Sequence, residues 1–286
     1  MSIRIEDVSH IYDKGYASAH IAIEQIHLEI EDGEFIGIIG HTGSGKSTLV
    51  QHLNGLMEPT SGRIFYNNQE IHKKEFNRKQ LRQKVGLVFQ YPEHQLFEVD
   101  VISDVMFGPK NLGLSEEEAK KRALDALELV GLEEAYYRQS PFDLSGGQKR
   151  RVAIAGVLAM KPEVLILDEP TAGLDPKGRM EILDQMKELQ SKTNITVLLV
   201  SHSMEDVAEY VNRMIVMKQG RILYDDIPSQ IFQYYRELEE IGLAAPQVTY
   251  LMRRLVQEGF LKETKATTIQ EATDEIMKVF DRSKHA

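Results

Sequence analysis

Residues 40–47 read GHTGSGKS, in which three glycines precede a lysine and a serine. The pattern G-x-x-x-x-G-K-[ST], placed between an expected strand and an expected helix, is typical of a phosphate-binding loop. Glycines let backbone N–H groups wrap a phosphate chain, and the helix N-terminus adds a positive dipole. We expect Lys46 to reach the β- and γ-phosphates and the Ser47 hydroxyl to ligate Mg²⁺. A glycine-rich turn with a solvated lysine is the simpler alternative.

A second motif, VLILDE at 164–169, is an apolar run that ends in two carboxylates. Asp168 at the end of a buried strand can hold Mg²⁺ through water, beside Ser47. Glu169 follows at once and could polarise the attacking water as a general base. Taken alone, a core strand that ends in a surface acid pair would be the better interpretation. Downstream of a phosphate loop, the catalytic interpretation is favoured.

Two further stretches fit phosphate chemistry. LSGGQ at 144–148 places a Ser-Gly-Gly cradle before a helix, which is a second phosphate-binding end. One chain needs only one such end for one γ-phosphate, so a spare suggests that two chains share their nucleotides head to tail. A helix N-cap with flexible glycines explains that stretch equally well by itself. His202 follows a buried strand and could donate to the γ-phosphate, although a lone histidine is more often structural.

The rest of the chain must position these motifs. Residues 2–39 alternate like strands, and a helix should follow Gly45 with Leu49, Leu53 and Leu56 on one face. Ser115 with Glu118 forms a capping box before a helix that Gly131 ends. Further helices are expected at 78–83, 147–160, 178–190 and in the tail after Pro228, and strands at 85–90, 163–170, 195–202 and in a hairpin at 213–226.

Composition limits the classes of function. The chain has 286 residues, a formal net charge of −10 and no cysteine. The acidic balance argues against broad nucleic-acid binding, which needs a basic surface. The absence of cysteine excludes disulfides and thiolate chemistry. The N-terminus does not resemble a signal peptide, and the longest apolar runs fall far short of a membrane span, so another chain would have to hold this protein at a membrane.

The ordered motifs resemble those of ATP-binding-cassette (ABC) transporter ATPases over residues 2–225. In chain order, the motifs are an N-terminal aromatic, the phosphate loop at 40–47 (Walker A), Gln90, the LSGGQ signature, VLILDE at 164–169 (Walker B), GLDP at 173–176 and His202. The resemblance implies that Tyr12 stacks on adenine, that Gln90 senses Mg²⁺ and the γ-phosphate, and that Asp175 lies at a dimer seam. The residues expected to bind ATP, the last three of them on a partner's nucleotide, are Tyr12, Gly40, His41, Thr42, Gly43, Ser44, Gly45, Lys46, Ser47, Thr48, Ser145, Gly147 and Gln148.

The fold implied is an α/β P-loop NTPase of the ABC ATPase type. It has a RecA-like core, an antiparallel β subdomain, a helical subdomain and a small C-terminal helical domain. The expected divisions are 1–95 for the first part of the core, 96–160 for the helical subdomain, 161–225 for the second part of the core, and 226–286 for the appended domain.

A narrower resemblance is carried by GHTGSGKSTLVQHLNGL, FQYPEHQLFE and FGPKNLGL. These stretches are similar to the ATPases of energy-coupling factor (ECF) transporters, and most of all to the second ATPase of a heterodimeric pair. The resemblance implies ATP-driven import of vitamins or other micronutrients, with peripheral attachment to the cytoplasmic face of the cell membrane. The implied partners are a second ATPase, a transmembrane coupling subunit and a substrate-capturing membrane subunit. A conventional ABC importer and a cobalt- or nickel-type ECF transporter are the alternatives.

Two other classes of ABC ATPase fit less well. DNA-repair ATPases insert a long coiled coil between the phosphate loop and the signature, and the corresponding gap here has no sustained heptads. Ribosome-associated ABC proteins carry two cassettes in one chain, and this chain has one. The basic run at 73–84 is the only feature that favours nucleic acid, and a solvated helix face explains it better because no aromatic platform recurs.

The stretch VFQYPEHQLFEVD at 88–100 suggests a contact with a partner. We expect Glu93, Glu98 and Asp100 to line a groove that receives basic side chains of the transmembrane subunit, since Arg–carboxylate pairs in a partly desolvated groove are strong. Tyr91, Leu96 and Phe97 would supply the apolar contact. A solvated acidic loop is the alternative.

Overall fold

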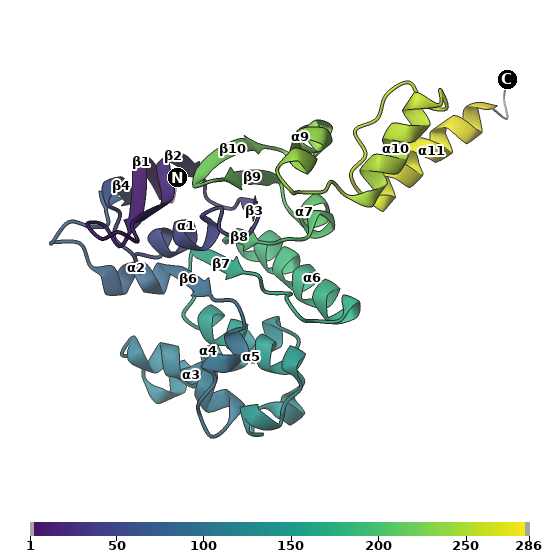
Figure 1. Cartoon of the computed structure of the whole chain (residues 1–286). Coiled ribbons are helices and arrows are strands. Elements are labelled where there is room, and N and C mark those ends of the chain that lie inside the picture. Colours follow the sequence, from purple (N-terminus) through teal and green to yellow (C-terminus); the bar gives the residue numbers. More distant parts are fainter. Residues whose placement is uncertain (1–2, 284–286) are drawn as a thin grey trace.

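The computed structural model describes residues 3–283 and contains two sheets (Figure 1). A four-stranded antiparallel sheet has the order β2-β1-β4-β5, and a six-stranded sheet has the order β10-β9-β3-β8-β7-β6. Their strands are β1 (Ile3–Tyr12), β2 (His20–Ile30), β3 (Phe35–Ile39), β4 (Ser61–Tyr66), β5 (Gln69–Glu70), β6 (Val85–Val88), β7 (Val164–Asp168), β8 (Thr196–Val200), β9 (Arg213–Lys218) and β10 (Arg221–Asp226). The expected hairpin at 213–226 is formed by β9 and β10.

The six-stranded sheet is parallel except at its β10 edge. All five residues of β7 are buried, as a parallel strand covered on both faces requires. Val164 and Ile166 pack in a core that includes the antiparallel sheet. Leu165 and Leu167 pack in a second core that is continuous with the helices. The carboxyl ends of the parallel strands therefore form a fixed edge between two packed layers.

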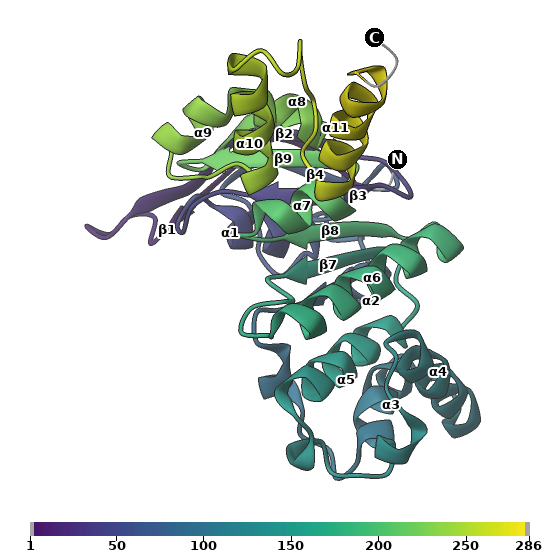
Figure 2. The ribbon, with the colours of Figure 1, turned by 90° about the vertical axis from the view of Figure 1, so that its right-hand side faces the viewer.

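The helices form three groups (Figures 1 and 2). One group accompanies the sheets, a second forms a separate lobe with α3, α4 and α5, and the last projects at the C-terminal end. Their bounds are α1 (Lys46–Leu53), α2 (Arg78–Lys84), α3 (Val101–Asn111), α4 (Glu116–Leu129), α5 (Gly146–Leu158), α6 (Pro176–Thr193), α7 (Met204–Tyr210), α8 (Pro228–Ile231), α9 (Tyr235–Glu240), α10 (Gln247–Gln257) and α11 (Ile269–Ser283), with short 3₁₀ turns η1 (Pro92–Gln95), η2 (Glu134–Tyr136), η3 (Pro141–Asp143) and η4 (Phe232–Tyr234). Between residues 3 and 283, no helix combines the length and apolar character needed to cross a bilayer.

Three local expectations were wrong in detail. The helix after Gly45 ends at Leu53, so Leu56 lies beyond it and is 43% exposed. The strand expected to reach residue 90 ends at Val88, because the chain turns away from β7 there, so Gln90 lies in the following loop. Ser115 caps α4, but only one half of the expected capping box forms, since Glu118 pairs instead with an arginine one turn later.

The C-terminal tail packs as two parts, each in a different hydrophobic core. Residues of α8, η4 and α9, such as Phe232 and Leu238, belong to the larger core. A separate small core forms around Met252, Ala266 and Ala272, between α10 and α11. The appended unit therefore has its own core only from α10 onward, whereas the sequence suggested a boundary at 226.

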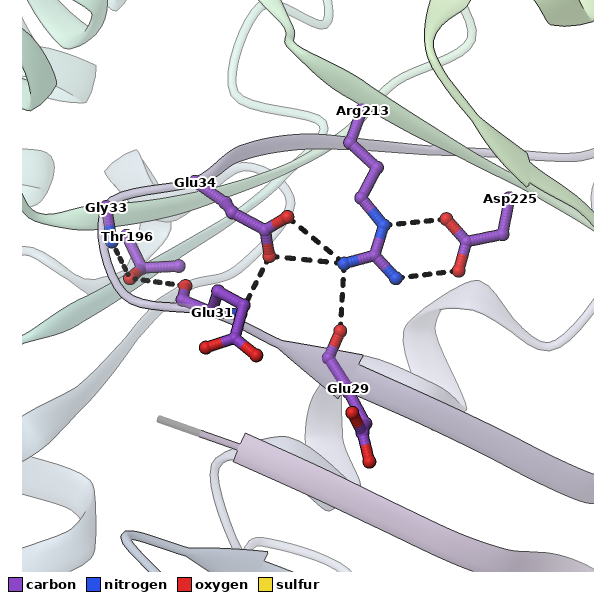
Figure 3. A network of polar contacts seen from close by, with 7 residues as sticks. All are labelled: Glu29, Glu31, Gly33, Glu34, Thr196, Arg213 and Asp225. Carbon is purple, nitrogen blue, oxygen red and sulfur yellow. Dashed lines mark hydrogen bonds and ion pairs between the residues drawn. The ribbon is translucent and has the colours of Figure 1, made fainter. Parts of the chain in front are cut away.

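A partly exposed ion network joins the turn before β3 to the β9–β10 hairpin (Figure 3). The guanidinium of Arg213 donates twice to Asp225, at 2.7 Å each, and also to the carboxylate of Glu34 at 3.1 Å. These partners, Asp225 first, raise the pKa of Arg213 above its ordinary value. The hydroxyl of Thr196 accepts the N–H of Gly33 at 2.9 Å. The network ties the β2–β3 turn, β8 and β9 into one frame.

His52 makes the fold sensitive to acid. The ring on α1 is fully buried, its Nδ1 donates to the carbonyl of Thr48 at 2.7 Å, and its Nε2 has no partner among the described residues. Burial, with a smaller contribution from His10 and His72, lowers the pKa of His52 to about 4. In the unfolded chain the imidazole binds a proton near pH 6.5, whereas in the native protein it binds one only near pH 4.

The unfolding free energy should therefore decrease as the pH falls through that window, by about 2 kcal/mol between pH 7 and pH 5 from this residue. His52→Leu should remove this part of the pH dependence even though it also loses one hydrogen bond. Urea unfolding at both pH values measures it. His27→Leu is the control, because that imidazole is exposed and, among residues 3–283, pairs only with Asp7. An unchanged pH dependence in His52→Leu would contradict the assignment.

Candidate functional site

A cleft of about 430 Å³ opens at the carboxyl ends of the parallel strands. It brings together the phosphate loop, the two Walker B carboxylates, Gln90 and His202, which the sequence scatters over more than 150 positions. Its lining is Tyr12, His20, Ile21, Ala22, Thr42, Gly43, Gly45, Lys46, Ser47, Thr48, Gln90, Asp168, Glu169 and His202. Of the loop residues expected to bind ATP, Gly40, His41 and Ser44 do not line this cleft.

The phosphate loop needs glycine for steric reasons. Gly45 caps α1 with φ at +102°, and a Cβ there would lie 2.6 Å from the carbonyl oxygen of Ala22. The side chain of Lys46 is folded over this loop, where its ammonium donates to the carbonyls of Gly40 at 2.6 Å and His41 at 3.0 Å. Lys46 is 6% exposed, and burial lowers its pKa against the opposing charges of Glu169 and Asp168.

The two carboxylates share one edge of the cleft. Burial raises the pKa of Asp168, although the Ser47 hydroxyl and Lys46 oppose the change. Burial and the neighbouring charge of Asp168 raise the pKa of Glu169 to about 7, against the lowering effect of Lys46. Glu169 therefore gains and loses its proton near neutrality, as a general base requires. Its backbone is in the left-handed region, at φ 53°, and its N–H donates to the carbonyl of Val200 at 3.0 Å.

His202 faces Glu169 across the cleft. Its Nε2 lies 3.0 Å from Glu169 Oε1, within ion-pair distance, yet Oε1 has no hydrogen-bond partner in the part of the chain that the structure describes. The contact is electrostatic, since the two atoms are close without hydrogen-bond geometry. Burial, and after it the charge of Lys46, lowers the pKa of His202. Gln90 reaches the same cleft from the loop after β6.

Sequence reasoning expected Tyr12 at the nucleotide but missed its neighbours in the cleft, His20, Ile21 and Ala22. Tyr12 ends β1, and its hydroxyl lies 3.2 Å from the hydroxyl of Thr48. His20 begins β2 opposite Tyr12, and the two rings stack at 5.2 Å between centroids. Ile21 and Ala22 follow on the same strand. The available signal was the short loop at 13–19 between two alternating runs, which places the start of the second run beside Tyr12.

The signature residues lie at a different cavity, also about 430 Å³, which they share with Asp175. Ser145 caps α5 in a complete capping box with Gln148, so its N–H groups are held in a fixed direction. Gly147 lies between them and lines the same cavity. None of these residues lines the cleft that contains Lys46. Within one chain, the two expected phosphate-binding ends are therefore separate.

The acidic stretch after Gln90 differs from the expectation. The carboxylate of Glu93 forms a bidentate ion pair with Arg150. Asp100 caps α3 by accepting the N–H of Ser103. Neither carboxylate is free to receive a basic side chain without giving up a bond. Leu96, expected as a contact residue, is 7% exposed and belongs to the core. Among residues 3–283, the carboxylate of Glu98 has no hydrogen bond or ion pair.

Comparisons with known proteins agree with this geometry. The family described as ABC transporter matches residues 23–172. The energy-coupling factor transporter ATP-binding protein EcfA2 of Clostridium tetani is 57% identical over 282 residues, 98% of either chain. The EcfA2 of Caldanaerobacter subterraneus is 51% identical over the full length of both chains.

Solved structures give the same result. cbiO1 from Clostridium perfringens, described as part of the ABC transporter complex cbiONQ, is 39% identical with a TM-score of 0.74 over 88% of this chain and 98% of its own. The cassette MJ0796, solved as a dimer in a post-hydrolysis state with ADP and Pi, is 31% identical with a TM-score of 0.70 over 79% and 98%. The expected P-loop fold is thereby confirmed. The chain belongs to the ABC transporter ATP-binding proteins and, within them, to the EcfA2 family of energy-coupling factor transporter ATP-binding proteins.

Proposed function

We propose that this chain is the ATP-hydrolysing subunit, of the second type, in an ECF importer that takes up vitamins or other micronutrients. The observation that carries the proposal is the cleft in which Lys46, Ser47, Asp168, Glu169 and His202 converge. A cation, a hydroxyl and two carboxylates at one strand edge are the groups that nucleotide hydrolysis uses. The identity to EcfA2 proteins over the whole chain supports the transport assignment.

The residues present fit a nucleotide with Mg²⁺. Burial raises the pKa of Asp168 and a hydrogen bond from the Ser47 hydroxyl opposes that rise, so the two side chains are close enough for both oxygens to hold one cation. Bound Mg²⁺ would neutralise charge on the β- and γ-phosphates. Gln90, which lines the same cleft, would add an amide oxygen. Tyr12 and the stacked ring of His20 provide a flat surface on which a purine could lie.

In this proposal, each group has one task in the hydrolytic step. Lys46 compensates the negative charge of the phosphate chain. Glu169 accepts a proton from the attacking water while the bond to the leaving phosphate oxygen breaks. His202, whose Nε2 is near Glu169, donates to the γ-phosphate and fixes its position. Because the pKa of Glu169 is about 7, the carboxylate can release that proton again at neutral pH.

A second ATPase completes the site. The capped N-terminus of α5 and the cleft are separate in one chain, which supports the proposal that Ser145 and Gly147 bind the nucleotide of another chain. Asp175 lies in the same cavity and would face the seam. MJ0796 is described as a dimeric cassette, which supports a head-to-tail pair. We propose a heterodimer with the first-type ATPase, attached to the cytoplasmic face of the membrane through transmembrane and substrate-capturing subunits.

The surface for the transmembrane subunit is an exposed aromatic patch beside Glu98. Phe97 and Phe107 meet edge to face at 4.8 Å, and they are 56% and 44% exposed. Tyr91 and Val99, in the same segment of the chain, are also exposed, at 45% and 79%. An exposed apolar patch of this kind marks an interaction site. This replaces the three-carboxylate groove with aromatic contacts and one free acid.

Glu98→Lys should reduce the membrane subunits recovered with the tagged full-length chain by about tenfold, because a basic partner would be repelled and the Glu98 carboxylate has no partner to lose within the described part of the chain. The measurement is affinity purification from native membranes, with identification of the co-purifying chains. Asp125→Lys, a charge reversal on the exposed face of α4, is the control and should keep the partners. Recovery of no membrane protein with the parent chain would refute the transporter assignment, and normal recovery with Glu98→Lys would refute the patch.

A cobalt- or nickel-type ECF transporter is the second candidate, and the 39% identity to cbiO1, part of the ABC transporter complex cbiONQ, neither favours nor excludes it. The substrate-capturing subunit found in the same purification separates the two candidates, because the ATPase itself does not contact the substrate in this proposal.

A further inference from the structure

We propose that Arg150 is a positioning residue that couples the membrane-facing segment after Gln90 to the loop that carries Glu169. The inference rests on the proposed function, since it concerns the same hydrolytic step. Arg150 lies on α5, two residues after the LSGGQ signature, and does not line the nucleotide cleft. With 2% exposure it is among the largest fully buried side chains of the described chain.

The guanidinium of Arg150 bonds two different segments. Nε and Nη2 donate to the two carboxylate oxygens of Glu93, at 3.2 and 2.8 Å. Nη1 donates to the backbone carbonyls of Pro170 and Ala172, at 3.1 and 2.5 Å. All three nitrogens are therefore occupied. A rigid planar fork can hold these acceptors at once, whereas a lysine ammonium, a single point of charge, cannot span them.

The carbonyl contacts bear on Glu169 because they hold the residues next to it. Glu169 has φ at 53°, a left-handed conformation that costs energy for a residue other than glycine. On one side its N–H donates to Val200, and on the other its carbonyl accepts the N–H of Ala172 at 3.2 Å. Arg150 binds the outer carbonyls of that same turn. Its removal would free the turn to relax and Glu169 to leave the position that faces His202.

The contact with Glu93 links Arg150 to the segment that is proposed to face the membrane subunit. Glu93 lies in η1, three residues after Gln90, between Tyr91 and Phe97 of the exposed aromatic patch. Arg150 shields this carboxylate, and the ion pair lowers the pKa of Glu93 in spite of burial. A displacement of η1 by a membrane partner would pull directly on the guanidinium. The same side chain would transmit it to the turn at 170–172 and to the helix that begins at the signature.

The test compares Arg150→Lys, Glu93→Gln and the double variant in the complex purified from native membranes. Three quantities are measured: the turnover number for ATP, the Kd for trinitrophenyl-ATP, and the midpoint of thermal unfolding without nucleotide. Arg122→Lys is the matched control, since Arg122 also donates to a glutamate but lies on α4, away from both segments. It should retain the turnover and Kd of the parent.

We expect Arg150→Lys to lower the turnover number by about tenfold while Kd stays within about twofold, because small displacements of a catalytic group slow the chemical step more than binding. Glu93→Gln should lower turnover by a smaller factor. The double variant should be no slower than Arg150→Lys alone, since the two residues act through one contact.

Turnover within about twofold of the parent in Arg150→Lys would overturn the proposal, as would a parallel loss of turnover, affinity and thermal midpoint. If Arg150→Lys does not fold, Glu93→Gln decides alone, and parent-like turnover in that variant overturns the proposal. A parent complex that hydrolyses no ATP would instead refute the proposed function. The role of Arg150 alone would be refuted if the parent complex hydrolyses ATP, the Glu169→Gln complex does not, and the Arg150→Lys complex keeps full turnover.

Discussion

Glu169→Gln is expected to lower ATP turnover by about 100-fold or more while ATP affinity stays within about twofold of the parent. The amide keeps the size of the side chain but cannot accept a proton from water. Binding should survive because Lys46 and the phosphate-loop N–H groups, not Glu169, hold the phosphates. Removing a buried carboxylate whose pKa is raised to about 7 should not weaken the fold. The measurements are phosphate release and nucleotide binding on the same preparation.

Glu188→Gln is the matched control, because Glu188 is an exposed residue on α6 that pairs with Lys192 at the helix surface. It should leave both turnover and affinity unchanged. Turnover near that of the parent in Glu169→Gln would remove Glu169 from the role of general base. A loss of turnover that merely follows a loss of bound ATP would show that the side chain acts in binding.

Lys46→Ala is expected to weaken ATP binding by about 10- to 100-fold and to lower hydrolysis at least as much. Lys46 is the cation inside the phosphate loop, and its ammonium bonds the carbonyls of Gly40 and His41. Without it, the phosphates would face those carbonyls and the two carboxylates at the strand edge. Equilibrium binding of a fluorescent ATP analogue measures the first effect, and phosphate release the second.

The control is Lys110→Ala, which removes a surface lysine paired with Glu116 on the helical lobe. It should change neither binding nor hydrolysis. Unchanged affinity in Lys46→Ala would contradict the role given to this lysine, even if hydrolysis were lost.

The fold and the cleft could be predicted because their signals are local. GHTGSGKS contains its own strand-to-helix turn, and the strand ending in Asp168 and Glu169 is recognised by its unbroken apolar run. Parallel strands bring their carboxyl ends to one edge, which places Ser47 beside Asp168 without knowledge of the tertiary structure. Residues joined by such rules were correctly expected to meet.

What could not be predicted depends on contacts between distant segments. Glu93 and Arg150 are 57 positions apart, and nothing in either stretch indicates that they pair. Asp100 was expected to face a partner, but a helix begins directly after it, and its carboxylate is more strongly bound as the cap. His20 has no motif of its own and reaches the cleft only because β2 pairs with β1 opposite Tyr12.

The central claim is that this chain binds ATP with the phosphate loop and hydrolyses it with Glu169. The most direct test measures bound ATP and released phosphate together, in complexes that contain the parent chain or Glu169→Gln, with Lys46→Ala as the reference for lost binding. The account predicts normal bound ATP and about 100-fold less phosphate release in Glu169→Gln, against a loss of both in Lys46→Ala. Phosphate release at the parent rate by an ATP-loaded Glu169→Gln complex would contradict it.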